Sequence, residues 1–476
     1  MNNFFHPSGT YTDHYQLTMS QAYFSRSVGE QHVVFDYFFR KLPFNGGYAI
    51  FAGLENLLDI LEHIQFNEDD IAFLRQWGFD SRFTDYLKNF RFKGSIYSSL
   101  EGDIVFPTRP VLRVEGSIIE TQIIETLLLN ILNFQTLIAT KASRMLHVAG
   151  QRSLIDFSMR RAQGGAAYHA SRAAIIGGFD ATSNVKSGMD FNIPVSGTMG
   201  HSFVQSFDDE LSAFRQFAQV WPQNSILLVD TYNSLESGLP NAIKIAKEME
   251  STGNRLKGIR LDSGDLADLS KKSRKMLDVA GLPYVNIFVS NQLDEFSIQT
   301  LLEQKAPIDG FGVGTNLGTG QPDAALDGVY KLAYAFDKPR IKISENTAKT
   351  TLPGKKQVHR ILDSEDGSYL ADIITLNEEN DISEMHYPLY NGKNTHFHKC
   401  RSVVLLHPVM KDGKRINEPK SVTEIAQFSK ERLHQLPESY KRLVNPQTYR
   451  VGLSSCLLKE RNHQIKNLKE EHSSRL

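Results

Sequence analysis

The sequence predicts an α/β protein whose central part is a β/α barrel. Between residues 152 and 336, short apolar runs alternate with helical segments, which is typical of a parallel sheet covered by helices. The apolar runs are continuous, as expected for strands that are buried on both faces. Roughly six to eight strand–helix units fit into this stretch, so a barrel is favoured over an open sheet.

The part before residue 152 predicts a separate α/β segment. Residues 12–24 predict a short helix, and residues 33–42 alternate in polarity and predict a strand that ends at a Pro- and Gly-containing turn. The pattern then predicts helices near 50–65, 68–76 and 80–89, a β-rich piece over 94–115 and a long helix over 117–149.

The central part contains the expected strand–helix units. We predict strands over residues 153–159, 180–186, 193–196, 225–230, 258–261, 285–289, 310–313 and 329–336. Helices are expected between most of them, over 165–176, 202–218, 236–250, 265–279 and 294–304. Asp265 and Asp294 open two of these helices and are expected to be ordinary N-terminal acidic residues.

The alternation stops after residue 337. Residues 337–402 predict strands and turns, and residues 416–440 and 455–470 predict polar helices. We therefore divide the chain into residues 1–150, a catalytic barrel over 151–337 and a C-terminal region over 338–476.

Composition limits the classes of partner. The chain has 53 basic and 54 acidic residues and a net charge of −1, which disfavours a general nucleic-acid binder. Cys400 and Cys456 match neither a zinc site nor a disulfide framework, so a reducing cytoplasm is expected. The most apolar helix, near 118–137, carries Glu120 and Glu125, so no membrane partner is expected.

The stretch from Pro194 to Phe203 predicts a loop that leads into the start of a helix. Free backbone N–H groups and the helix dipole favour an anion at such a position, and His201 lies there. A histidine at a helix start is more often a cap or a solvated side chain. The loop by itself therefore leaves the role of His201 open.

The ends of the predicted strands are unusually rich in charge. In a β/α barrel the chemistry occurs at the C-terminal ends of the strands. Those ends carry Arg160, Arg161, Ser183, Asn184, Thr198, His201, Asp230, Thr231, Asn233, Arg260, Asp262, Ser263, Ser290, Asn291, Gly314 and Thr315. Solvated loops explain the Ser and Asn residues but explain less well several Arg and Asp at one opening. Arginines suit bidentate binding of carboxylate or phosphate.

Two further features support a phosphorylated ligand. The stretch from Gly310 to Asn316 is a glycine-rich strand exit whose N–H groups can hold a phosphate, although its spacing alone is a weak signal. Asp230 and Asp262 lie at strand ends and suit Mg²⁺ held through water. The residues alone therefore indicate an enzyme that acts on an anionic, multiply phosphorylated substrate.

Six motifs resemble the nicotinate phosphoribosyltransferase family in order and spacing. They are TDHYQLTM (12–19), FSMRRAQGG (157–165), ATSNV (181–185), SGTMGHSF (196–203), GIRLDSGDL (258–266) and GFGVGTNL (310–317). The resemblance implies a type II phosphoribosyltransferase fold, with an irregular β/α barrel and an α/β domain built from both chain ends. Residues 338–476 would then complete the N-terminal domain.

The resemblance also implies a reaction. Nicotinate and 5-phosphoribosyl diphosphate would give nicotinate mononucleotide and diphosphate, the first step of NAD salvage from nicotinic acid. ATP would be a co-substrate whose hydrolysis is coupled through phosphorylated His201, and Mg²⁺ would assist. The family further implies a homodimer with shared active sites.

Matching the motifs residue by residue implies roles for the candidates. Nicotinate would lie near Tyr15, Thr198 and Arg260, with Phe157 opposite Tyr15. The phosphoribosyl group would lie near the glycine-rich exit, and Asp262 would join Arg260 and His201 as catalytic residues. The exit residues are Gly312, Gly314 and Thr315. Arg160 or Arg161, with Mg²⁺, would neutralise the leaving diphosphate, and the sequence does not decide between them.

Ser183 bears on the choice of substrate. Nicotinamide phosphoribosyltransferases carry Asp at the equivalent position, where it would repel a carboxylate, so Ser183 favours nicotinate. The alternatives are a nicotinamide or quinolinate phosphoribosyltransferase, or a catalytically silent barrel that serves as a scaffold. A silent copy would be expected to have lost His201, Arg260 or the glycine-rich exit, and the sequence retains all three.

Overall fold

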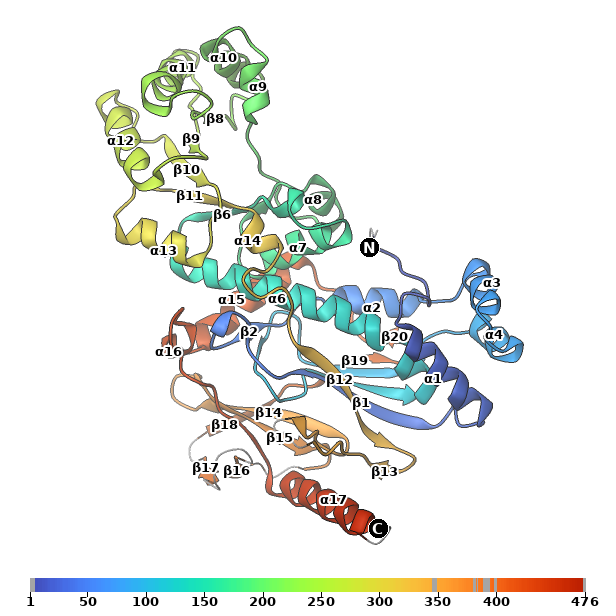
Figure 1. The fold of residues 1–476 in the computed structure, drawn as a ribbon. Coiled ribbons are helices and arrows are strands. Elements are labelled where there is room, and N and C mark those ends of the chain that lie inside the picture. Colours follow the sequence, from blue (N-terminus) through green and yellow to red (C-terminus); the bar gives the residue numbers. More distant parts are fainter. Residues whose placement is uncertain are drawn as a thin grey trace. The chain divides into compact units, whose positions relative to one another are not determined.

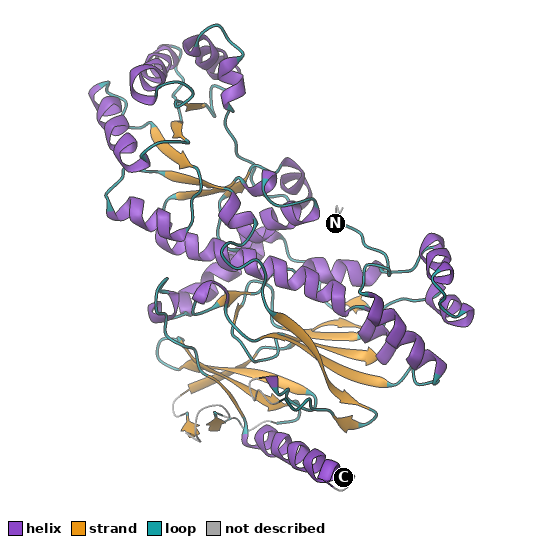
Figure 2. Ribbon diagram, in the orientation of Figure 1, coloured by secondary structure: helices purple, strands orange, loops and turns teal. Residues whose placement is uncertain are grey.

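The protein divides into two compact units. The computed structural model describes residues 5–344, 349–379, 382, 384–387, 394–397 and 400–473 (Figures 1 and 2). Unit 1 combines Met1–Thr140 with Ala325–Leu476, and unit 2 is Lys141–Ala324. The boundaries thus lie at 140/141 and 324/325, where the sequence suggested 150/151 and 337/338.

Unit 1 contains a seven-stranded sheet with the order β13-β12-β1-β5-β3-β19-β20. The strands are β1 (His32–Phe39), β3 (Ser95–Ser98), β5 (Leu112–Ser117), β12 (Gly328–Ala335), β13 (Lys338–Pro339), β19 (His407–Lys411) and β20 (Lys414–Arg415). β2 (Ala49–Ile50) and β4 (Ile104–Val105) form a separate two-stranded antiparallel sheet. Strands from both chain ends therefore form one sheet.

The placement of residues 329–336 in the barrel is wrong. They form β12, which pairs antiparallel with β1 in unit 1. Apolar Tyr330 alternates with polar Lys331, as a strand with two different faces requires, whereas a barrel strand would be apolar on both. The Tyr330 ring stacks on Phe35 at 4.6 Å, and its hydroxyl donates to the Thr121 carbonyl at 3.1 Å.

A second sheet of unit 1 has the order β17-β16-β21-β15-β14-β18. Its strands are β14 (Lys356–Asp363), β15 (Tyr369–Leu376), β16 (Glu384–His386), β17 (Asn394–His396), β18 (Cys400–Val404) and β21 (Val451–Leu453). Buried Asp36 on β1 and buried Lys356 on β14 form an ion pair of 2.8 Å that joins the two sheets. The region from 337 to 402 is therefore β-rich in its described residues, as predicted.

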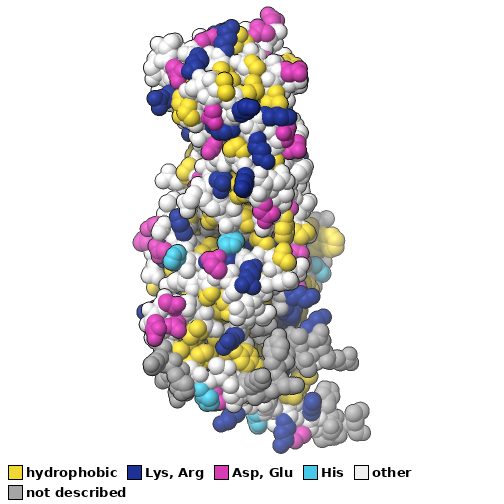
Figure 3. Space-filling view, turned by 90° about the vertical axis from the view of Figure 1, so that its left-hand side faces the viewer, with side chains coloured by type: hydrophobic (Ala, Val, Ile, Leu, Met, Phe, Trp, Pro, Cys, Tyr) yellow, Lys and Arg dark blue, Asp and Glu magenta, His cyan; other side chains and the backbone are white. Residues whose placement is uncertain are grey.

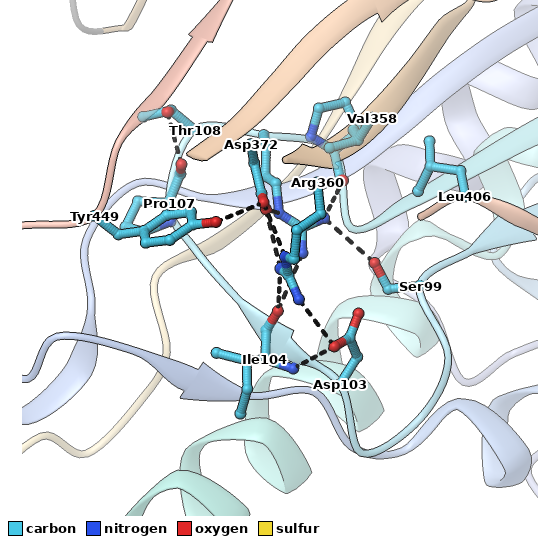
Figure 4. Close-up of polar contacts among 12 residues, drawn as sticks. Ser99, Asp103, Ile104, Pro107, Thr108, Val358, Arg360, Asp372, Leu406 and Tyr449 are labelled. Atoms are coloured by element: carbon cyan, nitrogen blue, oxygen red, sulfur yellow. Dashed lines mark hydrogen bonds and ion pairs between the residues drawn. The ribbon is translucent and has the colours of Figure 1, made fainter. Parts of the chain in front are cut away.

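A buried ionic cluster fixes the second sheet to the loop before β5 (Figure 4). Arg360 on β14 binds both carboxylate oxygens of Asp372 on β15, at 2.9 and 3.0 Å. It also pairs with Asp103 at 3.1 Å. Arg109 pairs with Asp372 at 2.8 Å, and the Tyr449 hydroxyl donates to Asp372 at 3.0 Å. All five side chains are buried, so each charge depends on its partners.

The helices of unit 1 pack against different parts of it. They are α1 (His14–Ser25), α2 (Leu54–His63), α3 (Glu68–Gln76), α4 (Ser81–Lys88), α5 (Ile118–Ile123) and α6 (Glu125–Ala149), followed late in the chain by α15 (Val422–Gln435), α16 (Glu438–Lys441) and α17 (Ser455–Ser473). Helix α5 contacts β1 and β5 of the first sheet, and α17 contacts β15 and β16 of the second. A hydrophobic core cluster packs Phe35 and Val114 of the first sheet with Ile119 of α5 and Leu128 of α6. The predicted helix over 117–149 is thus two helices that meet at Ile124.

Unit 2 contains the predicted parallel sheet, with the order β7-β6-β11-β10-β9-β8. Its strands are β6 (Ser153–Asp156), β7 (Ala181–Thr182), β8 (Ile226–Leu228), β9 (Gly258–Leu261), β10 (Asn286–Ser290) and β11 (Gly310–Val313). The helices are α7 (Gly165–Ile176), α8 (Val185–Phe191), α9 (His201–Gln205), α10 (Glu210–Val220), α11 (Leu239–Ser251), α12 (Leu266–Val279), α13 (Glu295–Glu303) and α14 (Thr315–Gly318). This curled parallel sheet confirms the predicted fold class.

Several predicted elements of unit 2 differ in detail. The strand expected over 180–186 is only β7 (Ala181–Thr182), because residues 185 and 186 already belong to α8. The strand over 193–196 is reduced to a single bridge between Val195 and Thr182. The helix over 202–218 is divided into α9 and α10, because the Asp209 side chain accepts from the Ser212 N–H at 2.8 Å and caps a new helix. Asp265 and Asp294 cap α12 and α13, as predicted.

The surface agrees with the composition. Basic and acidic side chains are interspersed over the described part of the face drawn in Figure 3. No helix within the described part of the chain is long and apolar enough to cross a membrane.

Candidate active site

The candidate residues of unit 2 lie at or just after the C-terminal ends of its parallel strands. Phe157 follows β6, Ser183 follows β7, and Arg260 is the third residue of β9. Because neighbouring parallel strands end at the same edge of a sheet, these side chains share one side of the unit. The structure therefore confirms that these candidate residues lie at the C-terminal edge of the parallel sheet.

His201 is the first residue of α9 and is held from two sides. Its Nδ1 lies 3.2 Å from Thr231 Oγ1, and its Nε2 lies 3.9 Å from Asp262 Oδ2. The side chain is 43% exposed, so the imidazole is oriented yet accessible. The sequence predicted free backbone N–H groups at this helix start, but the N–H of Phe203 donates to the Gly200 carbonyl at 3.0 Å and is not free to hold an anion.

Asp230 organises the loop that presents Asp262. One carboxylate oxygen of Asp230 accepts from the Asp262 N–H at 3.0 Å and from the Ser263 hydroxyl at 2.6 Å. The Ser290 hydroxyl donates to Oδ1 of Asp262, which leaves Oδ2 facing His201. The sequence placed Thr231 and Ser290 at strand ends, and the structure gives each a contact with a candidate catalytic residue.

The two carboxylates fit a weakly held Mg²⁺ better than a dedicated metal cage. Asp230 Oδ1 is buried and has no hydrogen-bond partner among the described residues. No cluster of three or more His, Cys, Asp and Glu side chains suited to a metal occurs in the described part of the chain. Magnesium is commonly bound by one or two carboxylates together with water and substrate phosphates. Asp230 and Asp262 match that donor set.

Arg260 combines a cation with an aromatic neighbour. Its Nη1 donates to Thr198 Oγ1, and its guanidinium carbon lies 5.9 Å from the centre of the Phe157 ring. Burial lowers the pKa of the guanidinium, and the nearby Asp262 carboxylate opposes that shift. Arginine remains charged in proteins, and Arg260 Nε is buried with no partner among the described residues. The position therefore suits a flat ligand with a carboxylate.

The glycines of β11 make room for aromatic rings. A Cβ at Gly312 would lie 2.3 Å from the Phe157 ring, and one at Gly310 would lie 2.7 Å from the Phe288 ring. Only glycine therefore lets Phe157 occupy its position. Gly314 caps α14, and Thr315 is the first residue of that helix.

The two arginines after β6 differ in their neighbours. Both are exposed. The charge of Arg160 contributes to the lowered pKa of Arg260, after the larger effect of burial. Arg161 instead lies beside Gly314, because a Cβ built on that glycine would be 4.0 Å from Arg161 Cγ. Arg160 thus lies nearer the Arg260 side and Arg161 nearer the glycine-rich exit.

Tyr15 belongs to unit 1, whereas the other candidates belong to unit 2. It lies in the first turn of α1, and its side chain is 49% exposed. Partial burial of the Tyr15 side chain raises the pKa of its hydroxyl, and the carboxylates of Glu125 and Asp13 add to that shift. Its proposed position opposite Phe157 stays a prediction.

Sequence reasoning missed Asp156 and Thr182. The predicted strand ran to residue 159, but β6 ends at Asp156, whose carboxylate accepts from the Ser158 N–H at 2.8 Å. An Asp side chain can accept from the backbone N–H two residues later and so favours a turn, which made this turn detectable. The contact of Asp156 with Thr182 could not be detected from the sequence, because the two residues are 26 positions apart.

Comparison with known proteins accounts for nearly the whole chain. Family models match for the nicotinate phosphoribosyltransferase N-terminal domain at residues 10–133, the nicotinate phosphoribosyltransferase family at 152–371 and the nicotinate phosphoribosyltransferase C-terminal domain at 355–461. A nicotinate phosphoribosyltransferase of Bacillus subtilis is 42% identical over 97% of this chain and 96% of its own length. A nicotinate phosphoribosyltransferase of Caenorhabditis elegans is 33% identical over 94% of this chain and 91% of its own length.

Solved structures give the same result. Human nicotinic acid phosphoribosyltransferase superposes with a TM-score of 0.85 at 30% identity, covering 95% of this chain and 99% of its own. A nicotinate-nucleotide pyrophosphorylase from Pyrococcus furiosus superposes with a TM-score of 0.71 at 25% identity, covering 91% of this chain and 99% of its own. The resemblance seen in the six motifs is therefore confirmed by full-length similarity. The chain belongs to the nicotinate phosphoribosyltransferase family.

Proposed function

We propose that this chain transfers the phosphoribosyl group of 5-phosphoribosyl diphosphate to nicotinate, releasing diphosphate. The product, nicotinate mononucleotide, opens NAD salvage from nicotinic acid. The observation that carries the proposal is the Arg260 guanidinium, which donates to Thr198 and lies 5.9 Å from the Phe157 ring. A carboxylate can bind the cation while the pyridine ring packs on the aromatic ring.

The proposed chemistry needs little from the protein beyond positioning and charge. The pyridine nitrogen of nicotinate carries a lone pair and attacks the anomeric carbon, whose bond to diphosphate breaks, so no strong base is required. Arg160 and Arg161 are exposed cations next to the exit of β6 and can neutralise the leaving diphosphate. Mg²⁺, held by Asp230 and Asp262 with substrate phosphates, would add positive charge there.

His201 is the residue we assign to ATP coupling. A proton on Nδ1 that is shared with Thr231 leaves the lone pair on Nε2, where neutral imidazole is a nucleophile near pH 7. Nε2 would attack the γ-phosphorus of ATP, and the bond to the ADP oxygen would break. Water later cleaves the N–P bond. The reaction is thus a glycosyl transfer coupled to ATP hydrolysis.

We further propose a cytoplasmic homodimer with shared active sites. Tyr15 of one protomer would reach the site formed by the barrel of its partner and stack on the pyridine ring. This proposal is supported by the half-exposed side chain of Tyr15 at the start of α1 and by the family resemblance.

The test supplies nicotinate, nicotinamide and quinolinate separately with 5-phosphoribosyl diphosphate, each with and without ATP, and separates the products by chromatography. We expect nicotinate mononucleotide from nicotinate, formed faster with ATP. Ser183 offers a neutral hydroxyl where an Asp would repel the carboxylate, so nicotinamide should react poorly. Product from nicotinamide alone would overturn the assignment, and no product from any of the three would indicate a silent scaffold.

A further inference from the structure

Asp156 is a buried carboxylate at the C-terminal end of β6. Its side chain has no exposed surface, and it forms no ion pair with a described residue. One oxygen accepts from the Ser158 N–H at 2.8 Å, and the other accepts from the Thr182 hydroxyl at 2.7 Å. The carboxylate therefore depends on groups from two neighbouring strand exits for its stabilisation.

The contact with Ser158 shapes the first exit. A carboxylate that accepts from the backbone two residues later turns the chain sharply. The turn is continued by a 3₁₀ segment, Ser158–Arg160, and it leaves Phe157 beside Gly312 and Arg260. Phe157 is also held by its own N–H, which donates to the Val313 carbonyl at 2.8 Å.

The contact with Thr182 shapes the second exit. The Thr182 hydroxyl that donates to Asp156 also accepts from the Asn184 N–H at 3.0 Å, which directs the start of α8. Between them, the Ser183 N–H donates to the Asp156 carbonyl at 2.8 Å. Asp156 thus binds Thr182 through its carboxylate and Ser183 through its carbonyl, and it reaches Asn184 only through the Thr182 hydroxyl.

We infer that Asp156, acting through Thr182, is the positioning residue that holds the Phe157 ring and the Ser183 hydroxyl in register with Arg260. This inference rests on the proposed function, because Phe157, Ser183 and Arg260 are the residues assigned to nicotinate. Asp156 does not contact the ligand itself. Its removal should misplace two contacting groups at once, and a displacement of about 1 Å near reacting atoms can reduce a rate by about 100-fold.

The experiment measures steady-state kinetics of nicotinate mononucleotide formation for Asp156→Asn, Thr182→Val and their combination. Each single variant should lower kcat/KM for nicotinate by about 10- to 100-fold. Thr182→Ser keeps the hydroxyl and should restore kcat/KM to within about threefold of wild type. Because the two groups act through one contact, the combined variant should be no worse than the more severe single variant.

A matched control lies at the opposite end of the same sheet. The Asp309 carboxylate accepts from the Ile287 N–H at 2.7 Å and so bridges β10 and β11 at their N-terminal ends. Asp309 is exposed, so Asp309→Asn should lower thermal stability less than Asp156→Asn does, and it should leave kcat/KM unchanged. Unaltered kinetics in Asp156→Asn or Thr182→Val, an equal loss in Asp309→Asn, or multiplied losses in the combined variant would overturn the inference. Absence of product from the wild-type protein would instead reject the proposed function.

Discussion

The Nε2 atom of His201 lies 3.9 Å from the Oδ2 atom of Asp262, although the two residues come from different strand exits. Thr231 contacts the other ring nitrogen, and Ser290 binds the other carboxylate oxygen. The imidazole is thus contacted by groups that follow β8 and β9, and Ser290 at the end of β10 holds the Asp262 carboxylate. This arrangement suits a histidine that gains and loses a phosphoryl group in a fixed orientation.

His201→Ala should lose ATP hydrolysis and acid-labile labelling from γ-phosphate-labelled ATP. It should retain slow, ATP-independent formation of nicotinate mononucleotide at high 5-phosphoribosyl diphosphate, because attack by nicotinate does not use the imidazole. His434→Ala, at an exposed position on α15, serves as the control and should behave as wild type. Nicotinate-dependent ATP hydrolysis by His201→Ala would show that another residue is phosphorylated.

Arg260→Ala should raise the KM for nicotinate by about 10- to 100-fold, since a charge-assisted contact is worth about 1.5–3 kcal/mol. The KM for ATP should change much less. Arg260→Lys should recover only part of the loss, because lysine lacks the bidentate fork. Arg255→Ala removes an exposed arginine that precedes β9 and is the matched control. Equal losses for all three substrates would mean that Arg260 has a structural role.

Tyr15 should act across a dimer interface. Tyr15→Ala and His201→Ala proteins, each deficient in ATP-coupled turnover, are mixed under conditions that allow subunit exchange. Hybrid dimers have one intact site, so random exchange should restore about a quarter of the wild-type rate. Tyr15→Phe keeps the ring and should remain active alone. If exchange is confirmed by mass spectrometry and no activity returns, the two residues do not serve a shared site.

The sequence was most informative about residues whose role is local to one strand exit. Continuous apolar runs identified β6, β9, β10 and β11, because strands buried on both faces have no polar alternation. The charged residues that follow such runs were therefore placed at the correct edge of the sheet. Arg260 and Asp262 are examples, because Arg260 is the third residue of β9 and Asp262 directly follows that strand, as the sequence predicted.

Contacts between distant residues could not be predicted from local patterns. The run from Val329 to Phe336 resembles the preceding strands in hydrophobicity, yet it pairs with β1 near the other end of the chain. The hydrogen bond between Asp156 and Thr182 likewise depends on the parallel pairing of β6 and β7. The sequence supplied both side chains, but only the tertiary structure specifies that they meet.

Asp372→Asn should strongly destabilise the protein. Asp372 is the common partner of Arg109 and Arg360, and all three are buried. Loss of its charge leaves two buried guanidinium groups with one fewer anion, which typically costs about 3–5 kcal/mol. Tyr449→Phe removes only one hydrogen bond to Asp372 and should cost about 1 kcal/mol. Urea unfolding followed by circular dichroism compares them, and equal midpoints would contradict the proposed importance of the charge.

His169 should make the stability of the protein depend on pH. Burial lowers the pKa of its imidazole from 6.5 to about 4, and the charge of Arg172 adds to that shift. Between these values the unfolded chain binds a proton that the folded chain does not, so stability falls as the pH is lowered through this window. The loss is about 1.4 kcal/mol per pH unit and about 3 kcal/mol in total. His169→Gln should therefore flatten the dependence, whereas His63→Gln, at an exposed position at the end of α2, should not. Urea midpoints measured from about pH 7 down to about pH 4 test this difference, and parallel curves for wild type and His169→Gln would rule it out.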